Sequence, residues 1–307
     1  MQRLRRVRRH LAAPQPPTST PTPLPTATAA ETEQPPRAEA GPLTPEQVLT
    51  FRTFGYVVMR HVLLPDELRT VNDEFTAGLA HHDATHPTPD DVVTLQRNWD
   101  NLQDHSPFIQ SLLEDERFAG AAGQLLGGPA VFFSSHSNLY SSDRSPWHPD
   151  HDQAHPRSLK LALYIGEPLT SSTGALRVVP GSHTAEFGDA LARIRLADID
   201  PGPHLNIVEG IDRGDPDGLR VDEMPCAVLE TEPGDVVAFD VRTWHGSWQG
   251  GSARRMLSMK YYKDPETPAE HASIQSWASQ VLLSRKMDRT LVRAFPERWL
   301  ANEAGSA

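Results

Sequence analysis

The residues best suited to chemistry in this chain are an H-x-D pair, His148 and Asp150, within the stretch Ser-Pro-Trp-His-Pro-Asp-His-Asp. Residues two apart on a β-strand point to the same face, so a strand here would place an imidazole beside a carboxylate. These are two of the three ligands of a 2-His-1-carboxylate facial triad, which holds ferrous iron and leaves coordination positions open. Because an isolated H-x-D pair also occurs by chance, the prediction depends on a third ligand elsewhere.

A third ligand and a basic residue follow later in the chain. His245 lies in Arg-Thr-Trp-His-Gly-Ser, after a Glu-Pro-Gly-Asp turn and a short apolar run, and is the candidate second histidine. Arg254 and Arg255 stand at the start of the next apolar run. A guanidinium grips a carboxylate with two parallel hydrogen bonds, so either arginine could hold the far end of a dicarboxylate whose near end chelates the metal. The two point to opposite faces of a strand, and the sequence does not fix the register.

The first part of the chain shows helical patterns, and the helices they predict could help to position these residues. Thr44, Pro45 and Gln47 form the start signal of a helix with a capping box. Further helices are expected from Pro65 towards Leu79 and from Pro107 to Leu126, with a polar, irregular stretch between them.

Short β-type runs dominate after Ala130. They cover residues 131–133, 137–140, 159–165, 175–179, 227–230, 235–240 and 256–262, and one earlier run covers 54–60. Helices followed by many short strands predict a mostly-β fold, an antiparallel jelly roll flanked by helices.

The domain organisation is predicted from composition. Residues 1–43 form a Pro/Thr/Ala-rich tail with almost no large apolar side chains, and are expected to be disordered. Residues 44–307 are expected to be a single domain. Its parts are a helical section (44–128), a jelly-roll core (129–264) with a lid insertion (184–226), and C-terminal helices (265–307).

Bulk composition excludes several classes of function. A formal charge of −11 argues against a nucleic-acid-binding surface. No apolar run approaches the roughly 18 residues that cross a bilayer, so no membrane partner is expected. The single cysteine, Cys226, cannot form an internal disulfide and fits a reducing compartment, which predicts a cytoplasmic location. A small-molecule substrate is the expected partner, and the sequence carries no indication of oligomeric state.

Together these segments resemble the phytanoyl-CoA dioxygenase (PhyH-like) family of Fe(II)/2-oxoglutarate-dependent oxygenases. The resemblance covers roughly residues 43–263. It rests on Trp-His-Pro-Asp (147–150), Gly-Ala-Leu-Arg-Val-Val-Pro-Gly-Ser-His (174–183), Pro-Gly-Asp (233–235), His-Gly-Ser (245–247) and Arg254.

The resemblance implies a double-stranded β-helix of the cupin-like type, with Fe(II) held by His148, Asp150 and His245. Related halogenases have a small residue where this chain has Asp150, so the carboxylate favours oxygenation. His151 and His155 are interpreted as pocket-mouth or solvated residues.

The resemblance also implies that 2-oxoglutarate and O2 are co-substrates. Arg254 would pair with the distal carboxylate of 2-oxoglutarate, with Arg255 as the alternative. Arg254 is preferred because the family's arginine lies four residues before a small hydroxyl residue, here Ser258, which would share its face. The strand containing Asn138 resembles the one that touches 2-oxoglutarate in relatives.

The implied activity is hydroxylation of a small organic molecule, in specialised metabolism, with release of succinate and CO2. Desaturation, epoxidation and cyclisation begin with similar steps and are not separated by the sequence. Two further alternatives are a non-catalytic jelly-roll protein that binds a metal or ligand, and a hydrolase or isomerase that uses another cation. No recognisable motif identifies the substrate. The segments expected to determine substrate choice are residues 83–100, residues 184–226 and the C-terminal helices.

Overall fold

The computed structural model describes residues 43–86, 96–140, 145–194, 219–250, 253–283 and 299. The chain divides into two units, Met1–Arg37 and Ala38–Ala307, and everything below concerns the second. The predicted tail, apart from residue 43, lies outside the described residues, as do residues 195–218 of the predicted lid and, except for 299, residues 284–307 of the C-terminal section.

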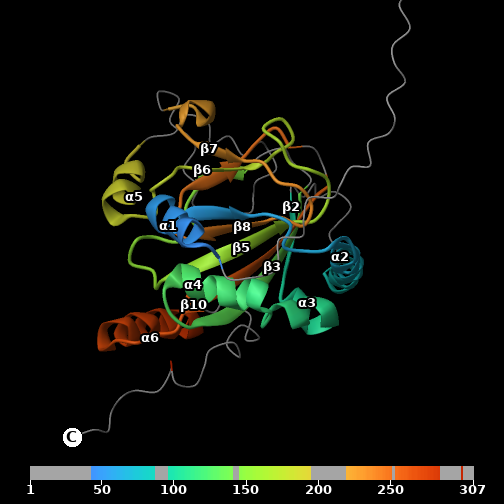
Figure 1. Ribbon diagram of the computed structural model, residues 1–307, viewed down its shortest axis with the longest axis horizontal. Coiled ribbons are helices and arrows are strands. Elements are labelled where there is room, and N and C mark those ends of the chain that lie inside the picture. Colours follow the sequence, from blue (N-terminus) through green and yellow to red (C-terminus); the bar gives the residue numbers. More distant parts are fainter. Residues whose placement is uncertain are drawn as a thin grey trace, which may run out of the picture. The chain divides into compact units, whose positions relative to one another are not determined.

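In Figure 1 the described helices lie to the left of, to the right of and below the strands. They are α1 (Pro45–Phe54), α2 (Pro65–Thr85), α3 (Pro107–Leu112), α4 (Ala121–Leu126), α5 (Ala185–Leu191) and α6 (Pro268–Leu283), with short 3₁₀ turns at Leu102–His105 and Val221–Glu223 and a π-helical turn at Glu116–Gly120. Helix α1 has the predicted capping box, in which Thr44 accepts from the amide of Gln47 and the Gln47 side chain accepts from the amide of Thr44.

Two antiparallel sheets form the core. The larger has the order β1-β8-β5-β10-β3-β2 and the smaller β4-β9-β6-β7. The strands are β1 (Tyr56–Met59), β2 (Gln96–Asp100), β3 (Ala130–Tyr140), β4 (Ser145–His148), β5 (Ser158–Tyr164), β6 (Leu176–Val178), β7 (Ala227–Leu229), β8 (Val236–Asp240), β9 (His245–Ser247) and β10 (Arg254–Lys263). Strands adjacent in space are often distant in sequence, as in a jelly roll, so the predicted mostly-β fold with flanking helices is confirmed.

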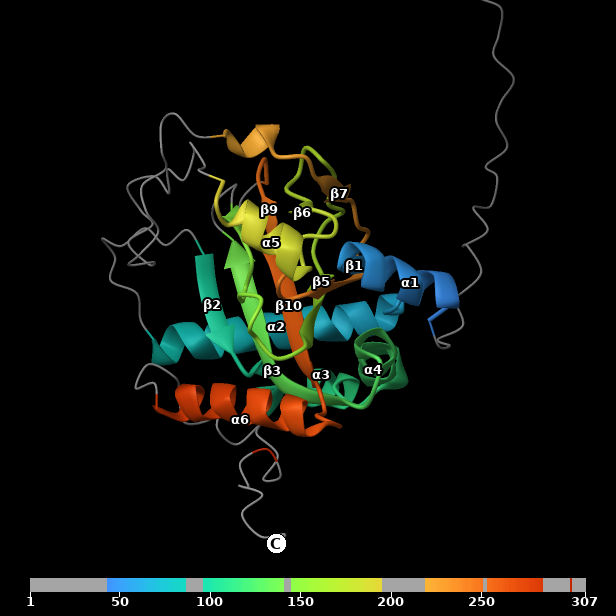
Figure 2. The same cartoon turned by 90° about the vertical axis from the view of Figure 1, so that its left-hand side faces the viewer.

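The larger sheet is covered on its outer face by helices. Leu159, Leu161 and Leu163 of β5 lie in one apolar core with Phe75 of α2 and Leu125 of α4. In both views the small sheet lies at the top, and α3, α4 and α6 lie at the bottom (Figures 1 and 2). The inner face of the larger sheet is therefore left to face the small sheet, and the site lies between them.

Two sequence-based expectations for the helical section were wrong. The helix expected from Pro107 to Leu126 is broken, because the Asp115 carboxylate accepts from the amide of Arg117 and restarts the chain in a new turn. The polar stretch before it contains strand β2, which has no apolar alternation and forms only by pairing with β3.

Arg117 ties the helical section together. Its guanidinium donates to both carboxylate oxygens of Glu67 on α2, at 2.8 and 2.9 Å, to Asp115, and to the carbonyl of Val62. The pKa values of Glu67 and Asp115 both lie below their usual range, mainly because each carboxylate accepts hydrogen bonds from Arg117.

We expect Arg117→Met to lower the free energy of unfolding by about 2 kcal/mol at pH 7, because two partly buried carboxylates lose their partner. Since the pKa values of both are depressed in the folded state, this stabilisation is complete above the unfolded values of about 4 and disappears as the pH falls below them. Urea unfolding at pH 7 and pH 3 checks this. Arg69→Met, which removes an exposed ion pair on α2, is the control and should leave the midpoint unchanged.

No helix within the described residues is long and apolar enough to cross a membrane.

Candidate metal centre

The candidate site is a cavity of about 380 Å³ on the inner face of the larger sheet. Its walls come from β2, β3, β5, β8 and β10 on one side and from β4, β6 and β9 on the other. Five of the predicted site residues line it: His148, Asp150, His245, Asn138 and Ser258.

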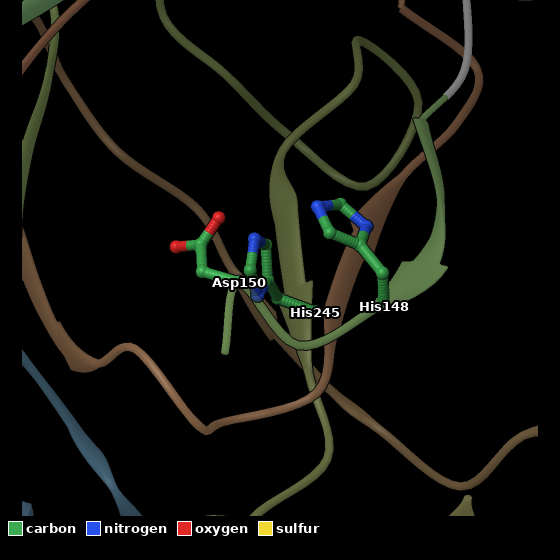
Figure 3. Close-up of side chains that lie close together, drawn as sticks. All are labelled: His148, Asp150 and His245. Carbon is green, nitrogen blue, oxygen red and sulfur yellow. The ribbon is translucent and has the colours of Figure 1, made fainter. Parts of the chain in front are cut away.

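The three predicted metal ligands converge in this cavity. Strands β4 and β9 pair so that His148 lies directly opposite His245, and their ring centroids are 4.4 Å apart. One donor atom from each of His148, Asp150 and His245 lies within 4.8 Å of the others, and Figure 3 shows the three side chains grouped together. Three donors this close can bind one metal ion.

Asp150 reaches the cluster by a different route from the one expected. Strand β4 ends at His148, and Asp150 lies in the bend beyond Pro149 rather than on the same strand face. The amides of Asp150 and His151 both donate to the carbonyl of Val241, at 2.9 and 3.2 Å. Proline ends the ladder because it has no amide hydrogen, and the two hydrogen bonds then hold the carboxylate in place.

His245 has its ring fixed in a form that suits a ligand. Nδ1 lies 2.8 Å from the carbonyl of Thr243, which can only accept, so Nδ1 carries the hydrogen and Nε2 carries the lone pair. Burial, and then the neighbouring His148, lowers the pKa of His245 to about 3. The imidazole is therefore neutral at pH 7, as metal ligation requires.

Asp150 is held as an anion with one oxygen available. Burial alone would raise its pKa, but the charge of Lys160 and the two histidines outweigh burial and hold it far below its usual range. Lys160 Nζ donates to Oδ1 at 2.8 Å, and although it is equally close to Oδ2, that contact lacks hydrogen-bond alignment. Within the described residues, Oδ2 is buried without a hydrogen-bond partner. A lone pair on Oδ2 beside two imidazoles fits a divalent cation of the Fe(II) type.

Arg254 lies at one end of the site and is buried. It is 8% exposed, stacks on Tyr140 with its guanidinium carbon 4.1 Å from the ring centroid, and donates to Ser247 Oγ at 3.0 Å and to the carbonyl of Gly174. Its Nε has no acceptor and no acidic side chain pairs with it in the part of the chain that the structure describes. A buried guanidinium without a carboxylate favours an anionic ligand.

Gly174 is needed for this approach. Its φ is +87°, and a Cβ there would lie 2.5 Å from Arg254 Nη1. Any side chain would both strain the turn and displace the guanidinium.

The remaining predicted residues divide between the two faces of β10. Arg255 points outwards and donates to Asn72 and Thr76 of α2. Ser258 faces the cavity, as does Asn138 on β3, and the Ser258 hydroxyl donates to the carbonyl of His136 at 3.4 Å.

Several cavity residues were missed by sequence reasoning. Ser247 was quoted as part of a motif but given no role, although it contacts Arg254. Asn98 and Asp100 lie on the unpredicted strand β2. Lys160 had a signal that could have been found, since it is a single charge within the apolar run Leu-Lys-Leu-Ala-Leu and so had to point into a polar interior.

His151 and His155 were interpreted as pocket-mouth or solvated residues, and the solvated alternative is wrong for His155. It is buried, and its Nε2 forms a hydrogen bond of 2.9 Å with the Tyr262 hydroxyl. Its ring stacks on that of His151, with the ring centroids 3.5 Å apart. Burial is the main cause that lowers the pKa of His151 to about 3 and that of His155 to about 2.

The fold and the site define a jelly-roll protein with a 2-His-1-carboxylate candidate metal centre. Its sequence matches the family described as phytanoyl-CoA dioxygenase (PhyH) over residues 51–256. The chain belongs to this family.

Individual relatives are more distant. An ectoine dioxygenase of Halomonas elongata is 27% identical over 160 residues, which cover 47% of this chain and 47% of the relative. The chain spans about half the length of the curated relatives it matches.

Solved structures share the fold. AviO1 from Streptomyces viridochromogenes superposes with a TM-score of 0.52 at 24% identity, covering 73% of this chain and 96% of AviO1. The epimerase SnoN, in complex with Fe3+, alpha ketoglutarate and nogalamycin RO, gives 0.50 at 19% identity, covering 74% of this chain and 88% of SnoN.

Proposed function

We propose that the protein is an Fe(II)/2-oxoglutarate-dependent oxygenase that hydroxylates a small polar molecule. The observation that carries the proposal is the convergence of His148, Asp150 and His245 in one cavity, with the Arg254 guanidinium close by and, among the described residues, no carboxylate paired with it. A protein that only bound a metal would have no need of a buried cation beside it.

The roles of the residues follow from their chemistry. The two imidazoles and the Asp150 carboxylate hold Fe(II), and Arg254 with Ser247 binds the distal carboxylate of 2-oxoglutarate. Bound Fe(II) supplies the activation of O2, so that 2-oxoglutarate, O2 and a substrate C–H bond yield succinate, CO2 and a hydroxylated product. Asn138 and Ser258 offer polar contacts to the co-substrate from the cavity wall.

The cavity supports a small, hydrophilic substrate. Its volume of about 380 Å³ must hold both the co-substrate and the substrate, and the β2–β3 wall contributes the polar side chains of Asn98, Asp100 and His136. Relatives named for action on ectoine, a small molecule, agree with this size. The fold relative SnoN is an epimerase of nogalamycin biosynthesis, which supports specialised metabolism as the setting and keeps other oxidative outcomes as the alternative to hydroxylation. We place the reaction in the cytoplasm, in keeping with the single cysteine.

Anaerobic addition of Fe(II) and 2-oxoglutarate to the purified protein should produce the visible absorption band of an iron–2-oxoglutarate chelate. Admission of air should then release succinate, and a small-molecule panel should identify the substrate by accelerating that release.

A chelator added before Fe(II) should abolish both signals, which makes metal removal the internal control. Absence of the band and of succinate, with the protein folded and Fe(II) bound, would contradict the oxygenase proposal. A band without succinate would support a binding protein instead.

A further inference from the structure

Lys160 is the charged residue in closest contact with the candidate metal ligands. It projects from β5 into the cavity, and its Nζ lies 2.8 Å from both oxygens of Asp150. Both side chains are largely buried, with 19% of Lys160 and 16% of Asp150 exposed. The ammonium and a metal ion must therefore share one carboxylate.

A second lysine provides a built-in comparison. Lys260 on β10 lies directly opposite Lys160 in the register of the two strands. Its ammonium is directed to His151 Nε2, at 2.5 Å, and it does not line the cavity. The two lysines thus share a neighbourhood, but of the two it is Lys160 that contacts Asp150.

We propose that Lys160 is a positioning residue that sets the charge of the metal centre, weakening the binding of the divalent cation while strengthening the binding of the dianionic co-substrate. This inference rests on the proposed function, because it assigns 2-oxoglutarate to the same cavity.

The argument is electrostatic. Lys160 bonds to Oδ1, and Oδ2, which has no hydrogen-bond partner among the described residues, is the oxygen of Asp150 left for a metal ion. A positive charge 2.8 Å from the carboxylate oxygens repels a cation bound there and attracts an anion through the same low-dielectric space. Removal of that charge must shift the two affinities in opposite directions, whereas general damage to the site would weaken both.

The test uses Lys160→Met, which keeps the length of the side chain without its charge. Isothermal titration with Ni(II) alone, and then with 2-oxoglutarate on the Ni(II)-loaded protein, gives the two affinities without turnover. We expect Ni(II) to bind about tenfold more tightly and 2-oxoglutarate about tenfold more weakly, the order expected for one nearby unit charge. Lys160→Arg keeps the charge and should stay close to wild type in both.

Lys260→Met is the matched control and should change both affinities by less than Lys160→Met does, because the Lys260 amine is directed to His151 and does not line the cavity. The inference is overturned if Lys160→Met weakens both ligands, changes neither, or matches Lys260→Met. If Lys160→Met does not fold, Lys160→Arg becomes the test. The inference is then overturned if the affinities of Lys160→Arg for Ni(II) and 2-oxoglutarate both rise or both fall relative to wild type. A wild-type protein that binds Ni(II) but not 2-oxoglutarate contradicts the proposed function instead, so the two failures are distinguishable.

Discussion

Replacing His245 by alanine should reduce Fe(II)- and 2-oxoglutarate-dependent succinate formation by more than about 100-fold. Loss of a residue that merely orients a metal ligand already costs about 10- to 100-fold, so loss of a ligand itself should cost more. The substitution removes the Nε2 donor that the Thr243 carbonyl holds in place, and leaves His148 and Asp150 as an incomplete pair. His148→Ala should behave alike. Succinate formation and Fe(II) affinity measured on the same preparation check both.

His183→Ala is the control for this experiment. His183 belongs to the Gly-Ser-His motif, but its Nε2 faces the carbonyl of Arg52 and it does not line the cavity. It should keep succinate formation and Fe(II) affinity close to wild type. Retained activity in folded His245→Ala would show that the metal is bound elsewhere.

Arg254→Ala should weaken 2-oxoglutarate binding with little change in metal affinity. Truncating one partner of a buried, hydrogen-bonded charge pair costs about 2–5 kcal/mol, which corresponds to about thirtyfold or more in Kd. The guanidinium is buried, stacked on Tyr140 and aligned by Ser247, so a water-filled gap cannot replace it. Titration of 2-oxoglutarate into the Fe(II)-loaded protein under anaerobic conditions, followed by the visible band, measures the effect.

Arg255→Ala is a closely matched control, since it removes the same side chain one position along β10. Its guanidinium contacts Asn72 and Thr76 of α2 on the outer face of the sheet. It should lower the stability of the fold slightly and leave the 2-oxoglutarate affinity within about threefold of wild type. The reverse ranking of the two variants would move the anchor to Arg255.

Much of this site could be predicted from residue types. His148, Asp150 and His245 were identified from ligand chemistry and from motifs in a fixed order, and Thr44 was identified as a helix cap. Both kinds of signal are local, because a few adjacent residues carry the donors and the backbone constraints.

Other features could not be predicted because they depend on pairing between distant segments. Strand β2 has no apolar alternation, so only its pairing with β3 places Asn98 and Asp100 in the cavity. Lys160 contacts Asp150 because the bend after Pro149 brings the carboxylate over β5, and neither segment encodes that contact alone.

The sequence by itself determined the candidate ligand set and the mostly-β fold of this protein, because side-chain chemistry and short-range patterns are properties of the chain. The tertiary structure alone decided which arginine faces inwards and which charges surround the carboxylate. Strand register has a period of two residues, and a shift of one position would have exchanged Arg254 for Arg255. That register is set by the packing of β10 between β3 and β5, two strands that lie about a hundred residues or more before it in the sequence.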